Sequence, residues 1–284
     1  MSLKISLVLC TVGRKKEVER FIKSLLVQTY KNYELIIIDQ NRNGLIDSIV
    51  DFYKRYINII HVKVDFKGLS KARNKGMDYV KGDIVAFPDD DCEYPFCILE
   101  RVNEFFAKYS DVGVLSGMAI DKTTGKVSAG KAILKAQYMS AFKLAGVSFT
   151  MFLNLRMIDR KFIYFDEKFG IGGSFYSEEE NDLVYRLLKM GYKGFYYPNK
   201  IFVFHPNKDF RFEDYNRAYK YGVGLGAFIR KNIMKREGLF FFARYLVVAP
   251  LFNLFRSSVL LNTNKIQFYF YRTKGRWEGF FKYR

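Results

Sequence analysis

The sequence has few of the residues that build disulfide frameworks or zinc sites. Its 284 residues include three cysteines and two histidines. Cys10, Cys92 and Cys97 are too few for a disulfide framework, and no pair of them has a zinc-like spacing with histidines nearby. A disulfide-stapled domain and a zinc module are therefore excluded, and a reducing, cytoplasmic setting is expected.

The two common glycine motifs for phosphate binding are also missing. No G-x-G-x-x-G follows the first apolar segment, and no G-x-x-x-x-G-K-[ST] occurs anywhere in the chain. If a nucleotide binds here, its phosphates must be neutralised in another way. Carboxylates that hold a divalent cation are the evident alternative.

Long uninterrupted apolar runs are absent as well. The N-terminal run MSLKISLVLC is too short and too broken for a secretory signal and predicts a buried strand. The longest apolar segment, 239–261, is interrupted by Arg244, Pro250, Asn253 and Arg256. A pair of interfacial helices is therefore favoured over a membrane-spanning helix, with a core helix or a dimer contact as the alternative.

Acidic residues are scarce toward the C-terminus. The net charge is +18 for the whole chain, with +2 in residues 1–100, +5 in 101–200 and +11 in 201–284. A nucleic acid, an anionic membrane surface or an acidic substrate would each suit this excess. Hydrophobic residues make up 49% of the chain, so it is expected to fold.

The first hundred residues alternate apolar runs with segments of helical spacing. Strands are expected at 5–10, 34–40, 57–64 and 83–87, and helices at 17–28, 46–53 and 70–80. This alternation predicts an α/β fold with a mostly parallel sheet covered on both faces. Ligands of such sheets bind beyond the carboxyl ends of the strands, where Thr11, Asp39 and the triplet Asp89–Asp91 are expected to lie.

The triplet lies in FPDDDCEYP, directly after an apolar run. Three adjacent carboxylates at the end of a buried strand can hold Mg²⁺ or Mn²⁺, whose remaining coordination positions phosphate oxygens can take. A solvated acidic turn is the other interpretation of the triplet taken alone.

Six segments together resemble glycosyltransferase family 2 of the bacterial polysaccharide type, with the GT-A fold. They occur in the family's order between residue 5 and about residue 206: SLVLCTVGR, ELIIIDQ, GLSKARNKG, FPDDDCEYP, SEEENDLVYRLLKMGYK and VFHP. The resemblance implies a Rossmann-like catalytic domain over residues 1–208. Residues 209–284 would then be a basic, aromatic helical extension.

The resemblance also implies a nucleotide site. Thr11, Arg14 and Asp39 match the positions that hold the base, and an aspartate can accept the N3–H of uracil or thymine. Gly68, Arg73 and Asn74 match the segment beside the ribose and diphosphate. For three of these residues an alternative stays open: Arg14 as a solvated residue, Asp39 as a strand-end cap, and Arg73 as an ion-pair partner of the aspartates.

The same resemblance assigns the chemistry. Asp91 and His205 would bind the metal, and Asp90 and Asp89 would contact the sugar nucleotide. Glu180 would be the general base and Glu179 the acidic residue before it. The family often has aspartate at the base position, so this chain departs there, and Glu179 and Glu178 remain alternatives. A capping box from Ser177 to Glu180 is the structural alternative, and His61 is expected to be structural.

These assignments predict a metal-dependent, inverting hexosyltransferase that uses UDP-sugars, or dTDP-sugars as second choice. The acceptor would be a glycan hydroxyl, on a polyprenyl-linked glycan if the basic C-terminal region lies peripherally on the inner face of the cell membrane. No nucleic-acid partner is expected, and a homo-oligomer is left open. A nucleotidyltransferase of related fold and a basic nucleic-acid-binding protein are the alternatives.

Overall fold

The computed structural model describes residues 2–130, 132–207 and 212–284. The chain forms two compact units that are interleaved in sequence. The first consists of Met1–Lys67, Lys71–Phe165 and Leu183–Lys208, and the second of Gly68–Ser70, Asp166–Asp182 and Asp209–Arg284. The expected domain boundary between residues 208 and 209 lies outside the described residues, so that boundary stays a prediction.

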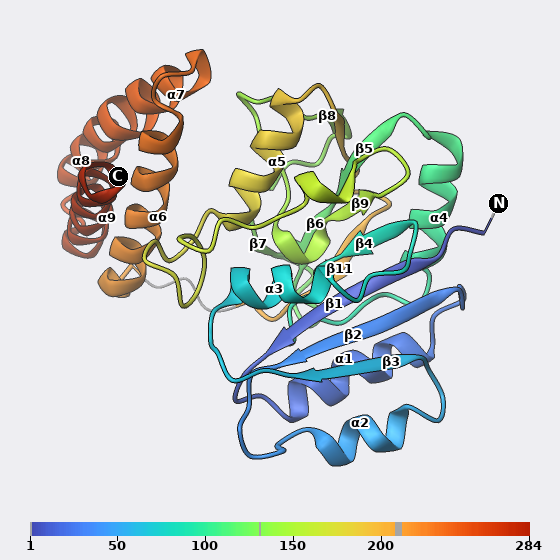
Figure 1. Cartoon of the computed structure of the whole chain (residues 1–284). Coiled ribbons are helices and arrows are strands. Elements are labelled where there is room, and N and C mark those ends of the chain that lie inside the picture. Colours follow the sequence, from blue (N-terminus) through green and yellow to red (C-terminus); the bar gives the residue numbers. More distant parts are fainter. Residues whose placement is uncertain (1, 131, 208–211) are drawn as a thin grey trace. The chain divides into compact units, whose positions relative to one another are not determined.

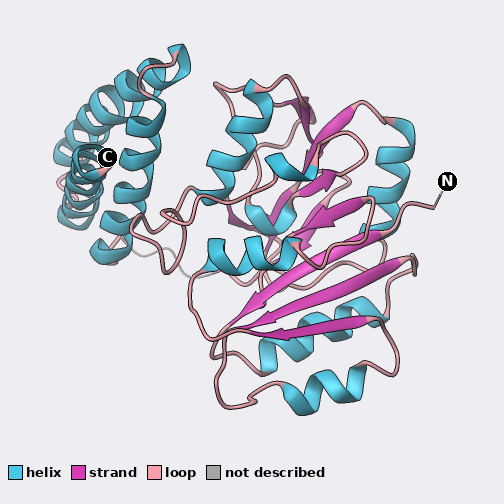
Figure 2. Ribbon diagram, viewed as in Figure 1, coloured by secondary structure: helices cyan, strands magenta, loops and turns pink. Residues whose placement is uncertain are grey.

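A twisted sheet, with helices on both faces, dominates the first unit (Figures 1 and 2). Among the described residues it has the strand order β3-β2-β1-β4-β9-β5-β10-β8. Pairs β1/β2, β1/β4, β2/β3 and β5/β10 are parallel, whereas β9 is antiparallel to β4 and β5, and β8 to β10. The predicted, mostly parallel α/β sheet is confirmed. Its strands are β1 (Ile5–Thr11), β2 (Tyr33–Asp39), β3 (Ile59–Lys63), β4 (Ile84–Ala86), β5 (Val112–Ser116), β8 (Gln137–Tyr138), β9 (Phe152–Asn154) and β10 (Lys193–Tyr196).

Alternate side chains of the buried strands meet helices on opposite faces. Leu7 and Leu9 of β1 belong to the main core, together with apolar residues of α1 (Lys16–Leu26), α2 (Asp47–Tyr53) and α4 (Ile98–Lys108). Val8 points the other way, toward α3 (Leu69–Met77), where a Cβ on Gly76 would lie 2.2 Å from the Val8 side chain. Period-two alternation along a strand accounts for this division.

A smaller sheet in the order β11-β6-β7 lies in the same unit. Its strands are β6 (Met118–Ile120), β7 (Val127–Ala129) and β11 (Phe202–Phe204). The remaining short elements are the 3₁₀ turns η1 (Ser148–Thr150) and η2 (Arg160–Phe162). Helix α5 (Glu179–Lys189) begins in the second unit and continues into the first. Strand β11 ends at Phe204 and therefore places His205 directly after a strand end.

The second unit is mainly helical, with α6 (Tyr215–Asn232) packed along α9 (Thr263–Lys282) (Figure 1). Glycines allow this close approach. A Cβ on Gly226 would lie 1.9 Å from the Arg276 carbonyl oxygen, and one on Gly279 would lie 2.0 Å from the Val223 carbonyl oxygen. The absence of side chains at these glycines is therefore what lets α6 and α9 pack closely.

Between these helices, α7 (Arg236–Phe241), the π-helical segment η3 (Phe242–Val248) and α8 (Ala249–Val259) run on without a break. The π-helical segment ends just before Pro250, which has no N–H to donate into the helix. Among the described residues, Arg236–Val259 is the one helix long and apolar enough to cross a membrane, although the sequence argued against such a span, and 22% of its most apolar window is buried.

Candidate active site

Strands β1, β2 and β4 end at one edge of the sheet (Figure 1). Thr11, the last residue of β1, pairs in register with Asp39, the last residue of β2, and both side chains are buried. Beyond β4, Asp89 forms a parallel bridge with Cys10. The polar residues that were expected at the carboxyl ends of these strands therefore lie on a common rim, as the parallel topology requires.

Arg14 binds two carboxylates of the triplet. Its Nη1 lies 2.6 Å from Asp90 Oδ1 and 2.7 Å from Asp91 Oδ2. Thr11 Oγ1 donates to Asp90 Oδ2 at 2.7 Å. The guanidinium supplies the positive charge that two buried neighbouring carboxylates require. Arg14 is thus placed on the aspartates, and the predicted roles of Thr11, Arg14 and Asp90 toward a nucleotide stay predictions.

His205 joins the triplet through a strand contact. Glu93, two residues after Asp91, exchanges two backbone hydrogen bonds with Phe204, and this bridge brings the next residue, His205, to the aspartates. His205 Nε2 lies 3.3 Å from Asp91 Oδ1, and the ring stacks on Phe149 with the two centroids 4.6 Å apart. Asp91 and His205 are therefore close enough to share an ion.

The donor set fits a divalent cation. One ligand atom from each of Asp89, Asp91 and His205 lies within 4.8 Å of the other two. His205 Nδ1 is buried and has no hydrogen-bond partner among the described residues. Two carboxylates and an imidazole suit Mn²⁺ or Mg²⁺. The structure thus brings together the two predicted metal ligands and adds Asp89, which the sequence had assigned to the nucleotide.

Helix α3 contributes Arg73 and Asn74. Arg73 is almost fully buried, and its Nη2 donates to Asp89 Oδ1 at 3.1 Å and to Ser148 Oγ at 3.0 Å. The alternative considered for Arg73, an ion pair with the aspartates, is what the structure shows. Asn74 Nδ2 donates to the Phe165 carbonyl at 2.8 Å, and its Oδ1 accepts the Phe165 N–H at 2.7 Å. Both side chains therefore also hold the fold, and their nucleotide contacts stay predictions.

Cation binding at the triplet is expected to weaken as the pH falls through about 6. Burial raises the pKa of Asp90 to about 6, the Thr11 hydrogen bond and the Arg14 charge oppose this rise, and Asp91 adds to it. A nearby cation favours the ionised carboxylate, so protons compete with it. We expect Mn²⁺ affinity to be about tenfold lower at pH 5 than at pH 7, as measured by Mn²⁺ titration followed by electron paramagnetic resonance.

Asp90→Asn is the matched comparison for this titration, because it removes the Asp90 carboxylate and leaves the ligand group of Asp89, Asp91 and His205 in place. The variant is expected to bind Mn²⁺ more weakly at pH 7 and to show a shallower pH dependence. Equal slopes in the wild type and the variant would contradict the assignment to Asp90. Thermal unfolding at each pH checks that both proteins remain folded.

The acidic segment of the second unit leads into α5. The residue before the helix, Glu178, has a φ of 76°, which residues other than glycine rarely adopt. Burial raises the pKa of Glu178, the hydrogen bond from Asn181 opposes this rise, and the charge of Glu179 supports it. The capping box from Ser177 to Glu180 is wrong, because α5 begins at Glu179 and Ser177 Oγ has no hydrogen-bond partner among the described residues. Glu180 lies in the first turn of α5, and its role as the general base stays a prediction.

Lys231 of α6 anchors this segment within the second unit. Its Nζ lies 2.7 Å from Asp182 Oδ1 and 2.8 Å from Asp166 Oδ2, and Asp182 is fully buried. Burial opposes the charge on Lys231, but the two carboxylates outweigh it and raise the pKa of the lysine. The sequence held no signal for this contact, because the lysine lies far along the chain from both partners.

Gly68 and Ser70 belong to the same unit. Gly68 has a φ of 131°, which favours glycine, and the next residue, Leu69, donates its N–H to the Ile171 carbonyl at 2.9 Å. Ser70 Oγ donates to the Phe169 carbonyl at 2.7 Å. The start of α3 is therefore tied to the glycine-containing segment 169–173, and the contact of Gly68 with a nucleotide stays a prediction.

The sheet, its rim and the aspartates define a GT-A-like α/β protein. The sequence model described as glycosyl transferase family 2 matches residues 6–165, which is more than half of the chain. The chain therefore belongs to glycosyltransferase family 2.

Among curated proteins, the chain is similar to the GalNAc(5)-diNAcBac-PP-undecaprenol beta-1,3-glucosyltransferase of Campylobacter jejuni. The two are 26% identical over 177 residues, which cover 56% of this chain and 54% of the relative. The matches to three other curated relatives cover only 39%, 15% and 13% of their lengths. The chain therefore matches only part of each of these relatives.

Two solved structures show the same fold over nearly the whole chain. The mannosyltransferase PcManGT of Pyrobaculum calidifontis, in complex with GDP-Man and Mn²⁺, has a TM-score of 0.69 at 13% identity, covering 97% of this chain and 87% of that one. S. aureus TarS 1–349, in complex with UDP, has a TM-score of 0.59 at 16% identity, covering 96% and 90%. At these identities the likeness concerns the fold alone.

Proposed function

We propose that the protein transfers a hexosyl group from a nucleoside-diphosphate sugar to a hydroxyl of a glycan acceptor, with inversion at the anomeric carbon. UDP is the favoured nucleotide and dTDP the second choice. The product would be a segment of a cell-surface polysaccharide.

The observation that carries this proposal is the group formed by Asp89, Asp91 and His205. It lies beyond β4 and β11, at strand ends of the unit that contains the family match. Thr11 and Asp39 lie at the ends of β1 and β2, in the same sheet as β4. Because the chain belongs to glycosyltransferase family 2, we favour glycosyl transfer at this site over nucleotidyl transfer or nucleic-acid binding.

The triplet and His205 would hold the donor's diphosphate through a divalent cation. Asp89, Asp91 and His205 would be its protein ligands, and Mn²⁺ or Mg²⁺ would neutralise the charge that develops on the leaving nucleoside diphosphate. Arg14 already places a positive charge on Asp90 and Asp91, at 2.6 and 2.7 Å. Arg73, beside Asp89, adds a second guanidinium, which is buried and would face a phosphate.

Glu180 would accept the proton from the acceptor hydroxyl as that oxygen attacks the face opposite the leaving group. A single displacement of this kind inverts the anomeric centre. Glu179 would contact the donor or acceptor. The raised pKa of Glu178 makes this neighbour the most serious rival for the role of base.

The acceptor is proposed to be a polyprenyl-linked glycan at the inner face of the cell membrane. The Arg236–Val259 helix exposes large apolar side chains, namely Leu239, Phe240, Val247, Val248, Leu251, Phe252, Phe255 and Val259. Arg236, Arg244 and Arg256 occur along the same helix. Exposed apolar side chains with basic residues suit an interface of anionic lipids, and the Campylobacter relative is named for an undecaprenol-linked acceptor.

A panel of nucleotide sugars tests the proposed function. UDP-, dTDP- and GDP-linked hexoses are incubated with the protein and Mn²⁺, and release of the nucleoside diphosphate is measured. We expect slow hydrolysis of UDP-sugars that stops when the metal is chelated. Turnover of nucleoside triphosphates with sugar 1-phosphates, and of no nucleotide sugar, would instead support a nucleotidyltransferase.

A further inference from the structure

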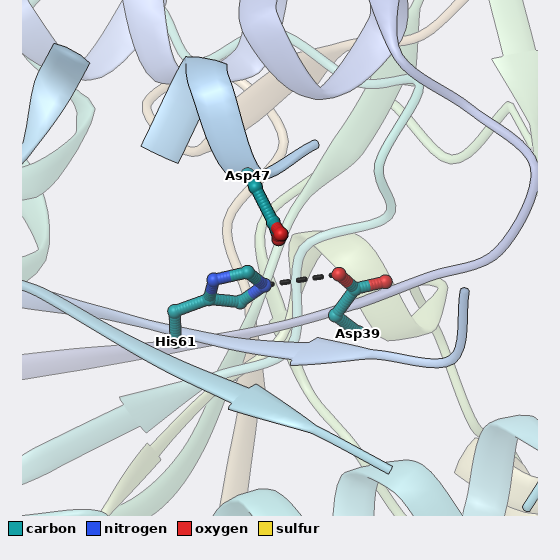
Figure 3. A group of neighbouring side chains, drawn as sticks. All are labelled: Asp39, Asp47 and His61. Carbon is teal, nitrogen blue, oxygen red and sulfur yellow. Dashed lines mark hydrogen bonds and ion pairs between the residues drawn. The ribbon is translucent and has the colours of Figure 1, made fainter. Parts of the chain in front are cut away.

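Asp39 is held from two sides at the end of β2. It is completely buried. Its Oδ1 accepts the backbone N–H of Asn41 at 2.9 Å and the side-chain Nδ2 of Asn41 at 2.7 Å. Its Oδ2 lies 3.0 Å from His61 Nε2, the contact drawn in Figure 3. Because a carboxylate only accepts hydrogen bonds, the proton of His61 belongs on Nε2 in this contact.

His61 reaches Asp39 because of the strand register. It lies on β3 opposite Ile37 of β2, so its ring points along the sheet toward the carboxyl end of the neighbouring strand. The side chain is 8% exposed. The carboxylate of Asp47, on α2, lies near the same end of the ring as Asp39, and Lys63 Nζ lies 2.5 Å from Asp47 Oδ2. Asp39, Asp47 and His61 lie close enough to one another to share a cation. The Lys63 ammonium group, however, already supplies a positive charge beside Asp47.

Asn41 connects Asp39 to the loop after β1. While Asn41 Nδ2 donates to Asp39, its Oδ1 accepts the backbone N–H of Gly13 at 2.7 Å. Gly13 has a φ of 72°, a backbone conformation that favours glycine. The Asn41 carboxamide therefore hydrogen-bonds to the Asp39 carboxylate of β2 and to the Gly13 backbone N–H after β1 at the same time.

A nucleobase offers the same pair of groups. Uracil carries its N3–H next to a carbonyl oxygen, and a primary amide carries its N–H next to a carbonyl oxygen on the same carbon. A base that donates to Asp39 and accepts from Gly13 would need the atoms that Asn41 now uses. Asp39 is completely buried, and Asn41 Nδ2 occupies its Oδ1, so a base that makes both contacts would have to displace the Asn41 side chain.

We propose that the Asn41 side chain acts as a place-holder: it occupies the position of the donor's nucleobase and is displaced when the base binds. His61 acts as a clamp: its hydrogen bond to Asp39 Oδ2 keeps the carboxylate in one orientation before and after this exchange. This proposal rests on the proposed function, because it assumes that Asp39 receives the base. It assigns His61 as a positioning residue, where the sequence had indicated a structural one, and it makes Asn41 a competitor of the donor.

The two side chains should therefore affect nucleotide affinity in opposite directions. Asn41→Ala removes the competing carboxamide and is expected to bind UDP about three- to tenfold more tightly. His61→Leu removes the hydrogen bond to Asp39 Oδ2 and is expected to bind UDP about tenfold more weakly. His61→Gln is expected to restore most of the affinity, because the glutamine side-chain amide can replace the Nε2–H donor.

Isothermal titration with UDP in the presence of Mn²⁺ tests this, with dTDP and GDP as further probes. Asn43→Ala is the matched control, since Asn43 is an exposed asparagine in the same loop, and its affinity should stay within about twofold of the wild type. Thermal unfolding checks that each variant is folded. If both residues only stabilise the fold, Asn41→Ala and His61→Leu should both bind UDP more weakly than the wild type, which would contradict the proposal.

The outcomes separate this inference from the proposed function. If the wild type binds UDP, dTDP or GDP and Asn41→Ala binds no more tightly, the place-holder is overturned while the proposed function stands. If folded His61→Leu binds as the wild type does, the clamp is overturned. If the wild type binds none of UDP, dTDP and GDP, the proposed function fails, and the inference fails with it.

Discussion

Replacing Glu180 by glutamine is expected to slow the hydrolysis of the best donor sugar by about 10²- to 10⁴-fold, which is the usual contribution of a general base. The glutamine keeps the shape of the side chain and loses its ability to take a proton from water or from an acceptor hydroxyl. Donor affinity, measured by titration with UDP, should stay within about twofold, because the base acts on the acceptor side of the reaction.

Three comparisons sharpen this experiment. Glu178→Gln and Glu179→Gln test the neighbouring carboxylates, of which Glu178 has the raised pKa and the unusual backbone conformation. Glu104→Gln, at an exposed position of α4, is the matched control and should retain wild-type hydrolysis. If Glu178→Gln loses hydrolysis and Glu180→Gln keeps it, the base is Glu178, and the family's motif has been aligned two residues out of place.

Much of the first sheet could be predicted because strands such as β1 and β2 are buried on both faces. The expected strand 34–40 is found as Tyr33–Asp39, and the expected helix 17–28 as Lys16–Leu26. A continuous apolar run identifies such a strand without any tertiary information. Helix α4 escaped prediction even though Ile98, Leu99, Val102, Phe105 and Phe106 have helical spacing. Strands β6 to β9 have two or three residues each, which is too short for any period to appear.

The rim of the site was also predictable, because the carboxyl ends of parallel strands meet at one edge whatever the strand order. The partners of the charged residues were not. The contacts of Arg14 with Asp90 and Asp91 were not predicted, because an ion pair across the fold depends on tertiary distances that no local pattern contains. For the same reason, the contact between His61 and Asp39 depends on the order and register of β2 and β3.

Asp91→Asn is expected to lower Mn²⁺ affinity by about 100-fold and metal-dependent donor hydrolysis by about 10²- to 10³-fold. The reason is that the variant loses a charged ligand of the cation that would stabilise the leaving diphosphate. The amide is almost the same size as the carboxylate and is a poor ligand for a hard cation. His205 would keep its position after Phe204, so the geometry of the remaining donors should be retained. Mn²⁺ titration followed by electron paramagnetic resonance measures the first effect, and release of nucleoside diphosphate the second.

The variant should fold, because it removes a charge that raises the pKa of its neighbour Asp90. Arg14 would keep its contact with Asp90. Asp111→Asn is the matched control, since Asp111 is an aspartate with 56% of its side chain exposed. Wild-type Mn²⁺ affinity in Asp91→Asn, together with a loss in Asp89→Asn, would show that Asp89 is the principal carboxylate ligand. Unchanged affinity in both variants would mean that the rim binds no cation, and the charge on the leaving diphosphate would then have to be met by Arg14 and Arg73.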